Sequence, residues 1–274
     1  MKRGQERYLS LPVIVVISAI AYIYLTTVFI YIERWYGLSS IHGILNAAAF
    51  TAIAAMCVYT YAIAVLREPG WVPPNYIPDI EDTNNPVHEI KRKSGDLRFC
   101  QKCSHYKPPR AHHCRSCKRC VLRMDHHCIW IDNCVGHGNY KIFLIFVMYG
   151  AIACFYSLVM LIGSLMVESA NDGKRTLYVV SGVVVIPVGV ALLILLGWHV
   201  WLVSQNKTTI EHHAGVRSML AAEKEGDVDK HPYDVGLYQN ITMVLGENVF
   251  CWIFPSSRHI GSGLRFRTAY HHNQ

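Results

Sequence analysis

Apolar residues are concentrated in four long blocks along the chain, and polar stretches separate these blocks. Each block is longer than the roughly 20 residues that a helix needs to cross about 30 Å of hydrocarbon. Helices buried in a soluble core are usually shorter and keep one polar face, so the pattern argues against a large soluble core. The blocks are Leu11–Ile32, Ile41–Leu66, Ile142–Val167 and Leu177–Val203. The sequence therefore predicts an α-helical polytopic membrane protein with four transmembrane helices.

The overall composition supports the same class. Of the 274 residues, 52% are hydrophobic and only 16% are charged. Soluble proteins carry about 25% charged residues on average. This deficit of charge favours a chain whose main environment is lipid.

Lysine and arginine are distributed unequally between the two sides of the predicted membrane. Three precede the first block, thirteen lie between Arg67 and Lys141, and seven follow Val203. The other two connections together hold three. Because loops rich in lysine and arginine remain in the cytosol, we expect both termini and the large central loop to be cytosolic.

These boundaries divide the chain into six predicted segments, of which the second and fifth each hold two helices. The stretch between Glu68 and Ser94 is rich in proline, asparagine and aspartate, as irregular linkers are. The segments are a cytosolic N-terminus (1–10), transmembrane helices 1 and 2 (11–66), a cytosolic linker (67–97), a cysteine-rich domain (98–141), transmembrane helices 3 and 4 (142–203) and a cytosolic C-terminal tail (204–274).

Cysteine spacing is the strongest chemical signal in the sequence. Seven of the ten cysteines lie between Cys100 and Cys134. The pattern C-x2-C-x9-H-C-x5-C begins at Cys100 and begins again at Cys114, so two copies overlap with an offset of fourteen residues. The cytosol is reducing, which favours metal binding or catalysis over disulfide bonds.

Each copy of the pattern supplies three thiols and one imidazole, the ligand set of a closed structural zinc site. One set is Cys100, Cys103, His113 and Cys120, and the other is Cys114, Cys117, His127 and Cys134. We therefore expect two structural zinc ions in a cytosolic zinc-binding domain between the second and third spans. An exchange of ligands between the two sets remains an alternative.

The repeat leaves one cysteine without a metal. A third copy beginning at Cys128 would need ligands at three positions that hold Ile131, Lys141 and Met148 instead. Cys128 is therefore predicted to be a free thiol among rigid metal ligands. The alternative is that Cys128 is idle or serves as an exchange ligand.

The residues beside Cys128 favour a nucleophile. His127 is assigned to zinc, but His126 can accept the thiol proton, and Asp125 can orient the His126 ring. A nucleophile, a base and an orienting group form a recurrent catalytic set. A purely structural role for His126 is the competing interpretation.

The position of Cys128 and the charges around it suggest the substrate. Only thirteen residues separate Cys128 from Ile142, so the thiol is expected near the cytosolic membrane face. The stretch from Leu97 to Met124 holds eight basic residues and no acidic residue. Basic side chains would attract the phosphates of an acyl-coenzyme A, or equally the anionic headgroups of the lipid bilayer. A nucleic-acid partner is not expected for so short a patch beside a membrane.

A dense set of motifs in this region resembles the DHHC family of protein S-acyltransferases, or palmitoyltransferases. The resemblance is carried by Lys107-Pro108-Pro109-Arg110-Ala111-His112-His113-Cys114, Asp125-His126-His127-Cys128, Cys134-Val135-Gly136 and Asn139. Three shorter motifs extend it, namely Glu68-Pro69-Gly70, Thr208-Thr209-Ile210-Glu211 and Asn240 with Val244 and Gly246. Ile129 stands where the family usually has proline, and Glu68 replaces aspartate.

The resemblance implies a two-step acyl transfer. Cys128 would take a fatty acyl group, palmitoyl above all, from acyl-CoA, and a protein cysteine would then receive it. His126 would act as the base and Asp125 would orient it, while both zinc ions would be structural. The implied substrates are membrane-associated proteins with cytosolic cysteines. We expect a multi-pass protein of the endomembrane system (Golgi, endoplasmic reticulum or plasma membrane) with a cytosolic active site.

Two other functions deserve comparison. A membrane-anchored zinc module, such as a RING-like ubiquitin ligase, would use every cysteine as a ligand, whereas Cys128 is left over here. A thioesterase would pass the acyl group to water, and only an acceptor experiment distinguishes it from a transferase.

Overall fold

A computed structural model describes residues 10–78, 97–167, 175–214, 231–256 and 261–269. Most of the predicted linker 67–97 and of the predicted N-terminus 1–10 lies outside these residues, as do parts of the tail 204–274. The chain forms two compact units. One comprises Met1–Val65 with Phe143–Trp198, and the other comprises Leu66–Ile142 with His199–Gln274.

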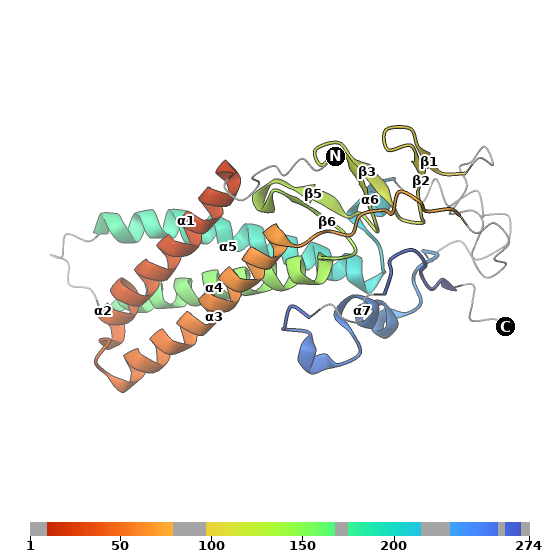
Figure 1. The fold of residues 1–274 in the computed structure, drawn as a ribbon. Coiled ribbons are helices and arrows are strands. Elements are labelled where there is room, and N and C mark those ends of the chain that lie inside the picture. The colour runs from red at the N-terminus through yellow and green to blue at the C-terminus, as the bar shows by residue number, and fades with distance from the viewer. Residues whose placement is uncertain (1–9, 79–96, 168–174, 215–230, 257–260, 270–274) are drawn as a thin grey trace. The chain divides into compact units, whose positions relative to one another are not determined.

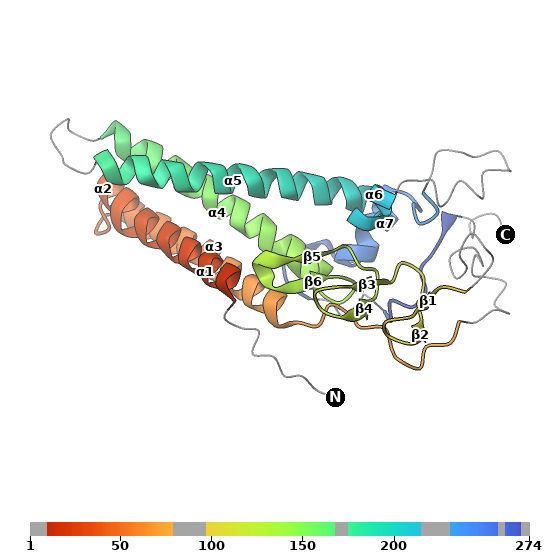
Figure 2. The same cartoon turned by 90° about the horizontal axis from the view of Figure 1, so that it is seen from above.

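Four long helices dominate the fold (Figures 1 and 2). The first runs through α1 (Leu11–Thr26), a π-helical segment (Thr27–Ile32) and α2 (Glu33–Tyr36). The others are α3 (Ile41–Leu66), α4 (Tyr140–Met166) and α5 (Arg175–Ser204). All four are long and apolar enough to cross a membrane. This confirms the predicted fold class, although the first apolar helix extends to Tyr36 and the third begins two residues earlier, at Tyr140.

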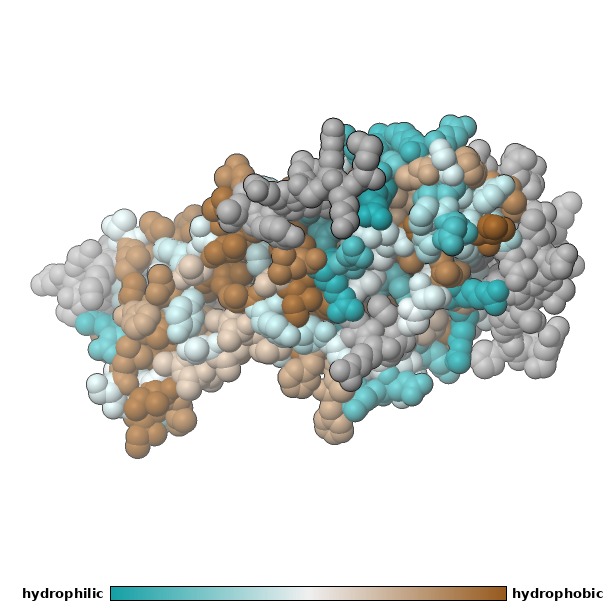
Figure 3. Space-filling view, in the orientation of Figure 1, coloured by the Kyte–Doolittle hydropathy of each residue, from teal (hydrophilic) through white to brown (hydrophobic). Residues whose placement is uncertain are grey.

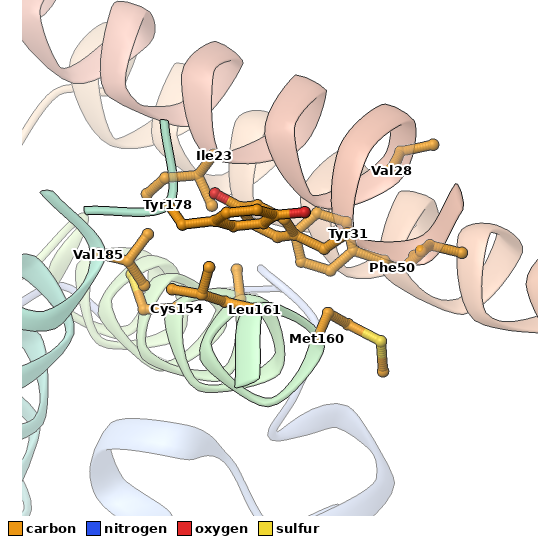
Figure 4. Close-up of a cluster of buried hydrophobic side chains, with 11 residues drawn as sticks. Ile23, Val28, Tyr31, Phe50, Cys154, Met160, Leu161, Tyr178 and Val185 are labelled. Atoms are coloured by element: carbon orange, nitrogen blue, oxygen red, sulfur yellow. The ribbon is translucent and has the colours of Figure 1, made fainter. Parts of the chain in front are cut away.

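The helical unit has an aromatic core (Figure 4). Tyr31 and Phe50 are almost completely buried, and the ring of Tyr31 lies 6.0 Å from that of Tyr178. Thr27 and Ser157 share a hydrogen bond of 2.8 Å between two helices. In lipid such pairs satisfy polar groups that have no water partner. Many large apolar side chains on the outer faces remain exposed, which suits contact with lipid (Figure 3).

The second unit is built on three short antiparallel hairpins, which the sequence analysis did not predict. They are β1 (Phe99–Cys100) with β2 (His105–Tyr106), β3 (His112–Cys114) with β4 (Arg119–Val121), and β5 (His126–Cys128) with β6 (Asn133–Val135). Strands of two or three residues carry too little alternation to be recognised from sequence. The hairpins nevertheless follow one another at the fourteen-residue interval of the cysteine pattern.

The same interval governs the backbone of the hairpin turns. Ser104, Lys118 and Asp132 all have positive φ angles, of 54°, 54° and 46°. Each lies just before the second strand of its hairpin. The left-handed conformation is unusual for residues other than glycine. Its recurrence at fourteen-residue spacing shows that the third hairpin has the same turn geometry as the first two.

Short helices complete this unit. They are α6 (Thr209–Ala214), α7 (Leu237–Leu245) and the 3₁₀ turns Ile129–Ile131 and Val249–Cys251. Arg110 joins the hairpins to α6 through a bidentate ion pair with Glu211, with N–O distances of 2.7 and 2.8 Å. The same guanidinium donates to the side chain and the carbonyl of Asn206. The segment after α5 is thereby fixed against the hairpins.

Candidate functional site

The first metal-ligand set lies at the first two hairpins. His113 and Cys120 face each other across β3 and β4, and Cys100 and Cys103 bracket the turn after β1. The Nδ1 atom of His113 lies 3.5 Å from the sulfur of Cys100, 3.2 Å from that of Cys103 and 3.8 Å from that of Cys120. The hairpin register therefore gathers four donor atoms from 21 residues of sequence.

The second set repeats this arrangement one hairpin later. His127 and Cys134 face each other across β5 and β6. The Nδ1 atom of His127 lies 3.7 Å from the sulfur of Cys114, 3.5 Å from that of Cys117 and 3.6 Å from that of Cys134. The two sets group as the direct pairing of the repeat requires, without an exchange of ligands.

Both sets fit zinc. A tetrahedral zinc ion with bonds of about 2.3 Å to sulfur and about 2.0 Å to nitrogen requires neighbouring donor atoms about 3.5 to 3.8 Å apart. The separations in the two sets run from 3.2 to 3.8 Å. Three thiolates and one imidazole leave no open position for a substrate. Each set can therefore hold a structural zinc ion.

Cys128 occupies, in the third hairpin, the position that Cys100 and Cys114 occupy in the first two. Its hairpin turn continues through Ile131, which is apolar and fully buried and offers no ligand. Cys128 belongs to none of the three groups of potential metal ligands in the described part of the chain, of which the third is Asp125, His126 and His199. The thiol is only 8% exposed, which shields it from water.

The alternation of side chains along β5 separates two kinds of chemistry. Successive residues of a strand point to opposite faces. His127 points to the second metal set, so His126 and Cys128 share the other face of β5. A hydrogen bond with the Cys128 side chain is among the causes that raise the pKa of His126. The strand thus places the His126 imidazole beside the thiol, while His127 between them faces the second set of potential zinc ligands.

Asp125 orients the His126 ring. Its Oδ2 atom accepts a hydrogen bond of 2.8 Å from His126 Nδ1. The Thr209 backbone N–H donates to Oδ1 at 3.0 Å, and the Thr209 hydroxyl donates to Oδ2 at 2.8 Å. Asp125 is completely buried, and these donors keep its charge satisfied. With Nδ1 engaged, Nε2 of His126 is the nitrogen that can accept a proton.

These contacts shift the pKa of both residues. Burial alone would lower the pKa of His126, but its hydrogen bonds with Asp125 and Cys128 outweigh burial and raise it to about 9. Burial would raise the pKa of Asp125, but its hydrogen bond with His126 and nearby positive charge lower it. The pair therefore combines an ionised carboxylate with a strengthened imidazole base.

Two residues at this site were missed by the sequence analysis. His199 of α5 lies with its ring 5.8 Å from that of His126, and its Nδ1 atom is 3.0 Å from the Tyr140 hydroxyl. Both are almost fully buried. The sequence did contain a signal for His199, because this histidine lies inside an apolar block. Ionisable residues are rare in membrane spans and are usually functional there. Thr209 was noted only as part of a motif.

The basic residues near the site fall into two groups. Arg110 and Arg123 are buried, at 4% and 5% exposure, and both donate to Asn206. They have structural partners inside the unit. Lys102, Arg115 and Lys118 are exposed and Lys107 is half-buried, so solvent reaches these four side chains.

Known proteins resemble this chain in sequence. The profile of the family described as DHHC palmitoyltransferase matches residues 93–215. "Probable protein S-acyltransferase 16" of Arabidopsis thaliana is 63% identical over 267 residues, covering 95% of this chain and 93% of that protein. The chain belongs to the DHHC palmitoyltransferase family. It is an acyltransferase and, with its four apolar helices, a multi-pass membrane protein.

Other DHHC palmitoyltransferases resemble the chain over different extents. "Probable protein S-acyltransferase 15" of Arabidopsis thaliana is 42% identical over 253 residues, which cover 89% of this chain and 97% of that protein. "Palmitoyltransferase ZDHHC15" of Mus musculus is 37% identical over 179 residues, covering 63% of this chain and 51% of the mouse protein. Similarity to the two plant relatives therefore extends well beyond the zinc-binding region.

Proposed function

We propose that the chain transfers a fatty acyl group, palmitoyl above all, from acyl-CoA to cysteine thiols of other proteins through a thioester on Cys128. One observation carries the proposal. The third hairpin completes the second metal set with His127 and Cys134 but offers no ligand set to Cys128, and it places that cysteine on the strand face of His126.

In the first step the Cys128 sulfur attacks the thioester carbonyl of acyl-CoA. His126 takes the thiol proton as the sulfur–carbon bond forms. The bond between the acyl carbon and the sulfur of coenzyme A breaks, and His126 returns the proton to that leaving thiolate. The products are an acylated Cys128 and free coenzyme A. Asp125 keeps Nδ1 of His126 protonated, so Nε2 remains the working nitrogen.

In the second step a cysteine of the protein substrate replaces coenzyme A. His126 takes the proton of the incoming thiol, which attacks the carbonyl carbon of the Cys128 thioester. Cys128 leaves as a thiolate and regains the proton from His126. The enzyme is restored and the substrate carries the acyl group. No water is consumed, which distinguishes this reaction from thioester hydrolysis.

Acyl-CoA is the proposed donor because it combines anionic phosphates with an apolar acyl chain, and the protein offers a suitable environment for each. Lys102, Lys107, Arg115 and Lys118 can attract its phosphates. The apolar spans supply a lipid environment for the acyl chain. We expect charge reversal at these lysines and arginines to raise the KM for acyl-CoA.

The two metal sets have a structural role in this proposal. Cys100, Cys103, His113 and Cys120 would hold one zinc ion, and Cys114, Cys117, His127 and Cys134 would hold the other. A zinc ion with three thiolates is a poor electrophile, because the ligands outweigh its charge. The ions would instead fix the hairpins that position His126 and Cys128.

The proposed orientation places both termini and Cys128 in the cytosol of the endomembrane system. The excess of basic residues in the central loop and the two termini supports it. Substrates would then be membrane-associated proteins with cytosolic cysteines. Epitope tags at both termini should become accessible to antibody when only the plasma membrane is permeabilised.

The deciding experiment labels purified protein with an alkyne-tagged palmitoyl-CoA. Wild type is compared with Cys128→Ala and with Cys251→Ala, a matched control at the half-buried thiol of the C-terminal segment. We expect a hydroxylamine-sensitive label on wild type and on Cys251→Ala but none on Cys128→Ala. The zinc content of all three proteins should be two ions per chain.

Other outcomes would contradict the proposal in distinct ways. An equal label on Cys128→Ala and wild type would move the acyl group to another residue. Absence of label on every protein, with two zinc ions bound, would favour a binding module. If a cysteine peptide failed to speed release of the acyl group from labelled enzyme, the protein would be a thioesterase.

A further inference from the structure

An uncharged segment after α7 carries large apolar side chains on its surface. We call residues 248–254 (Asn-Val-Phe-Cys-Trp-Ile-Phe) the apolar loop. Val249, Phe250, Ile253 and Phe254 are 55%, 86%, 47% and 51% exposed. In Figure 3, brown and tan side chains project where Figure 1 draws the segment after α7. An apolar cluster of this kind usually marks a contact with a partner or with lipid.

The apolar loop has a defined conformation. Asn248 caps the 3₁₀ turn by accepting a hydrogen bond from the Phe250 backbone N–H at 3.0 Å. Further backbone bonds join Cys251 to Asn248 and Trp252 to Val249. The Trp252 indole donates to the Gly246 carbonyl at 2.8 Å. These bonds pair several of the loop's backbone groups with one another and with Gly246, while the side chains of Val249, Phe250, Ile253 and Phe254 stay exposed.

Two contacts fix this segment to the ends of membrane helices. Lys141, the second residue of α4, donates to the carbonyls of Leu245 and Cys251 at 2.7 and 2.9 Å. Asn240 donates to the carbonyl of Ser204, the last residue of α5, at 2.8 Å. Because α4 crosses the membrane and α5 returns, the start of α4 and the end of α5 lie at the same membrane face. The contacts hold the apolar loop beside the first turn of α4 and hold α7 beside the last residue of α5.

We propose that the apolar loop inserts its exposed side chains into the lipid of the membrane that the four helices span. Interfacial membrane segments place phenylalanine, leucine and tryptophan side chains into the lipid at the boundary between membrane and water, because removal of apolar surface from water is favourable. The absence of charged residues from 248–254 suits this depth. The loop acts as a fifth, interfacial membrane contact that fixes α7, and through Asn240 the end of α5, against the bilayer.

Photocrosslinking tests the proposal on the full chain. Benzoylphenylalanine replaces Phe250, and the protein is illuminated in nanodiscs of phosphatidylcholine. The same residue replaces Arg115, which is exposed in the turn between β3 and β4, as a control. We expect phospholipid adducts on the peptide that contains position 250, at least tenfold more abundant than at position 115.

A covalent dimer formed through position 250 would show that a second copy of the chain covers the loop, and it would overturn the proposal. Equal lipid adducts at positions 250 and 115, or none at either, would overturn it as well. A second measurement uses the double variant Phe250→Ser/Phe254→Ser. We expect trypsin to cleave the C-terminal segment at least threefold faster in this variant while its zinc content stays at two. An unchanged cleavage rate would contradict a membrane contact.

Discussion

At the scale of single residues, two adjacent histidines have opposite environments. His127 directs Nδ1 to three sulfurs, whereas His126 directs Nδ1 to the Asp125 carboxylate. The reason is the two-residue period of strand β5. Because the period also places Cys128 beside His126, the order of these four residues along the chain follows directly from the geometry of a strand.

This separation predicts different effects for the two histidines. His126→Gln is expected to reduce acylation of Cys128 by about 10²- to 10⁴-fold, the usual contribution of a general base, while two zinc ions remain bound. His127→Ala should release one zinc ion and destabilise the hairpins. Measuring the labelling rate and the zinc content of each variant checks both. Loss of zinc from His126→Gln would contradict the assignment of its ring to catalysis.

Thr209 should act through Asp125. Thr209→Val removes the hydroxyl that donates to Oδ2 but keeps the backbone donor to Oδ1. A hydrogen bond to a charged group contributes about 1.5–3 kcal/mol, so acylation should slow by roughly 10- to 150-fold. Thr209→Ser keeps the hydroxyl and should restore a rate near wild type. If Thr209→Ser were as slow as Thr209→Val, the hydroxyl would not be sufficient to support Asp125, and the proposed role of its hydrogen bond would be contradicted.

At the scale of elements, one repeated hairpin carries both the metal-ligand candidates and the proposed nucleophile. The second and third hairpins supply facing histidine and cysteine ligands, and the third also carries Cys128, which belongs to neither Cys/His set. The Asp132 backbone has the same left-handed conformation as Ser104 and Lys118. The proposed nucleophile thus lies in a hairpin whose conformation repeats that of the other two.

The ion pair of Arg110 with Glu211 is the main link between the hairpins and α6, and it has a definite pH signature. Burial would raise the pKa of Glu211, but Arg110 outweighs burial and lowers it to about 2. A depressed carboxylate pKa contributes stability above the unfolded pKa of about 4.3, and that stability is lost as pH falls toward the folded value.

We therefore expect Glu211→Gln to lower the free energy of unfolding by about 3 kcal/mol, because an unpaired guanidinium stays buried. The difference from wild type should remain constant between pH 5 and pH 8, where the carboxylate is ionised in both states. Thermal unfolding at several pH values measures it. Glu247→Gln, at an exposed carboxylate, should have no effect. A difference that shrank already at pH 6 would mean a raised pKa.

At the scale of the whole molecule, the two units owe their stability to different forces. The helical unit satisfies its backbone within each helix and presents apolar side chains outward, as lipid requires. The hairpin unit has two- and three-residue strands that cannot be stable alone. We expect its order to depend on metal binding and on the buried ion pair of Arg110 with Glu211.

Removal of zinc should distinguish the two units. A strong chelator is expected to abolish acylation of Cys128 and to unfold the hairpins, since binding energy at structural zinc sites is folding energy. The four membrane helices should persist, so helical circular dichroism should change little. Zinc analysis, labelling and circular dichroism on one sample measure all three. A parallel loss of helicity would show that the units fold as one.

The sequence by itself determined the four membrane spans, because the length of an apolar block must match the thickness of the bilayer. It also determined the two ligand sets and the unassigned Cys128, because a fourteen-residue repeat is visible in the spacing of chemically distinct residues. Thiol and imidazole groups at this spacing are typical zinc ligands, and a cysteine outside the two sets is a candidate nucleophile, so residue type and spacing alone predicted both roles.

Only the tertiary structure decided how the site is assembled. Nothing in the local pattern brings Thr209 of α6 to Asp125, or His199 of α5 to within 5.8 Å of His126. Those contacts depend on how segments separated by more than 70 residues pack, and on strands too short to leave a periodic signal. The position of the apolar loop likewise depends on the hydrogen bond from Lys141 to the Cys251 carbonyl, which joins residues 110 positions apart in the sequence.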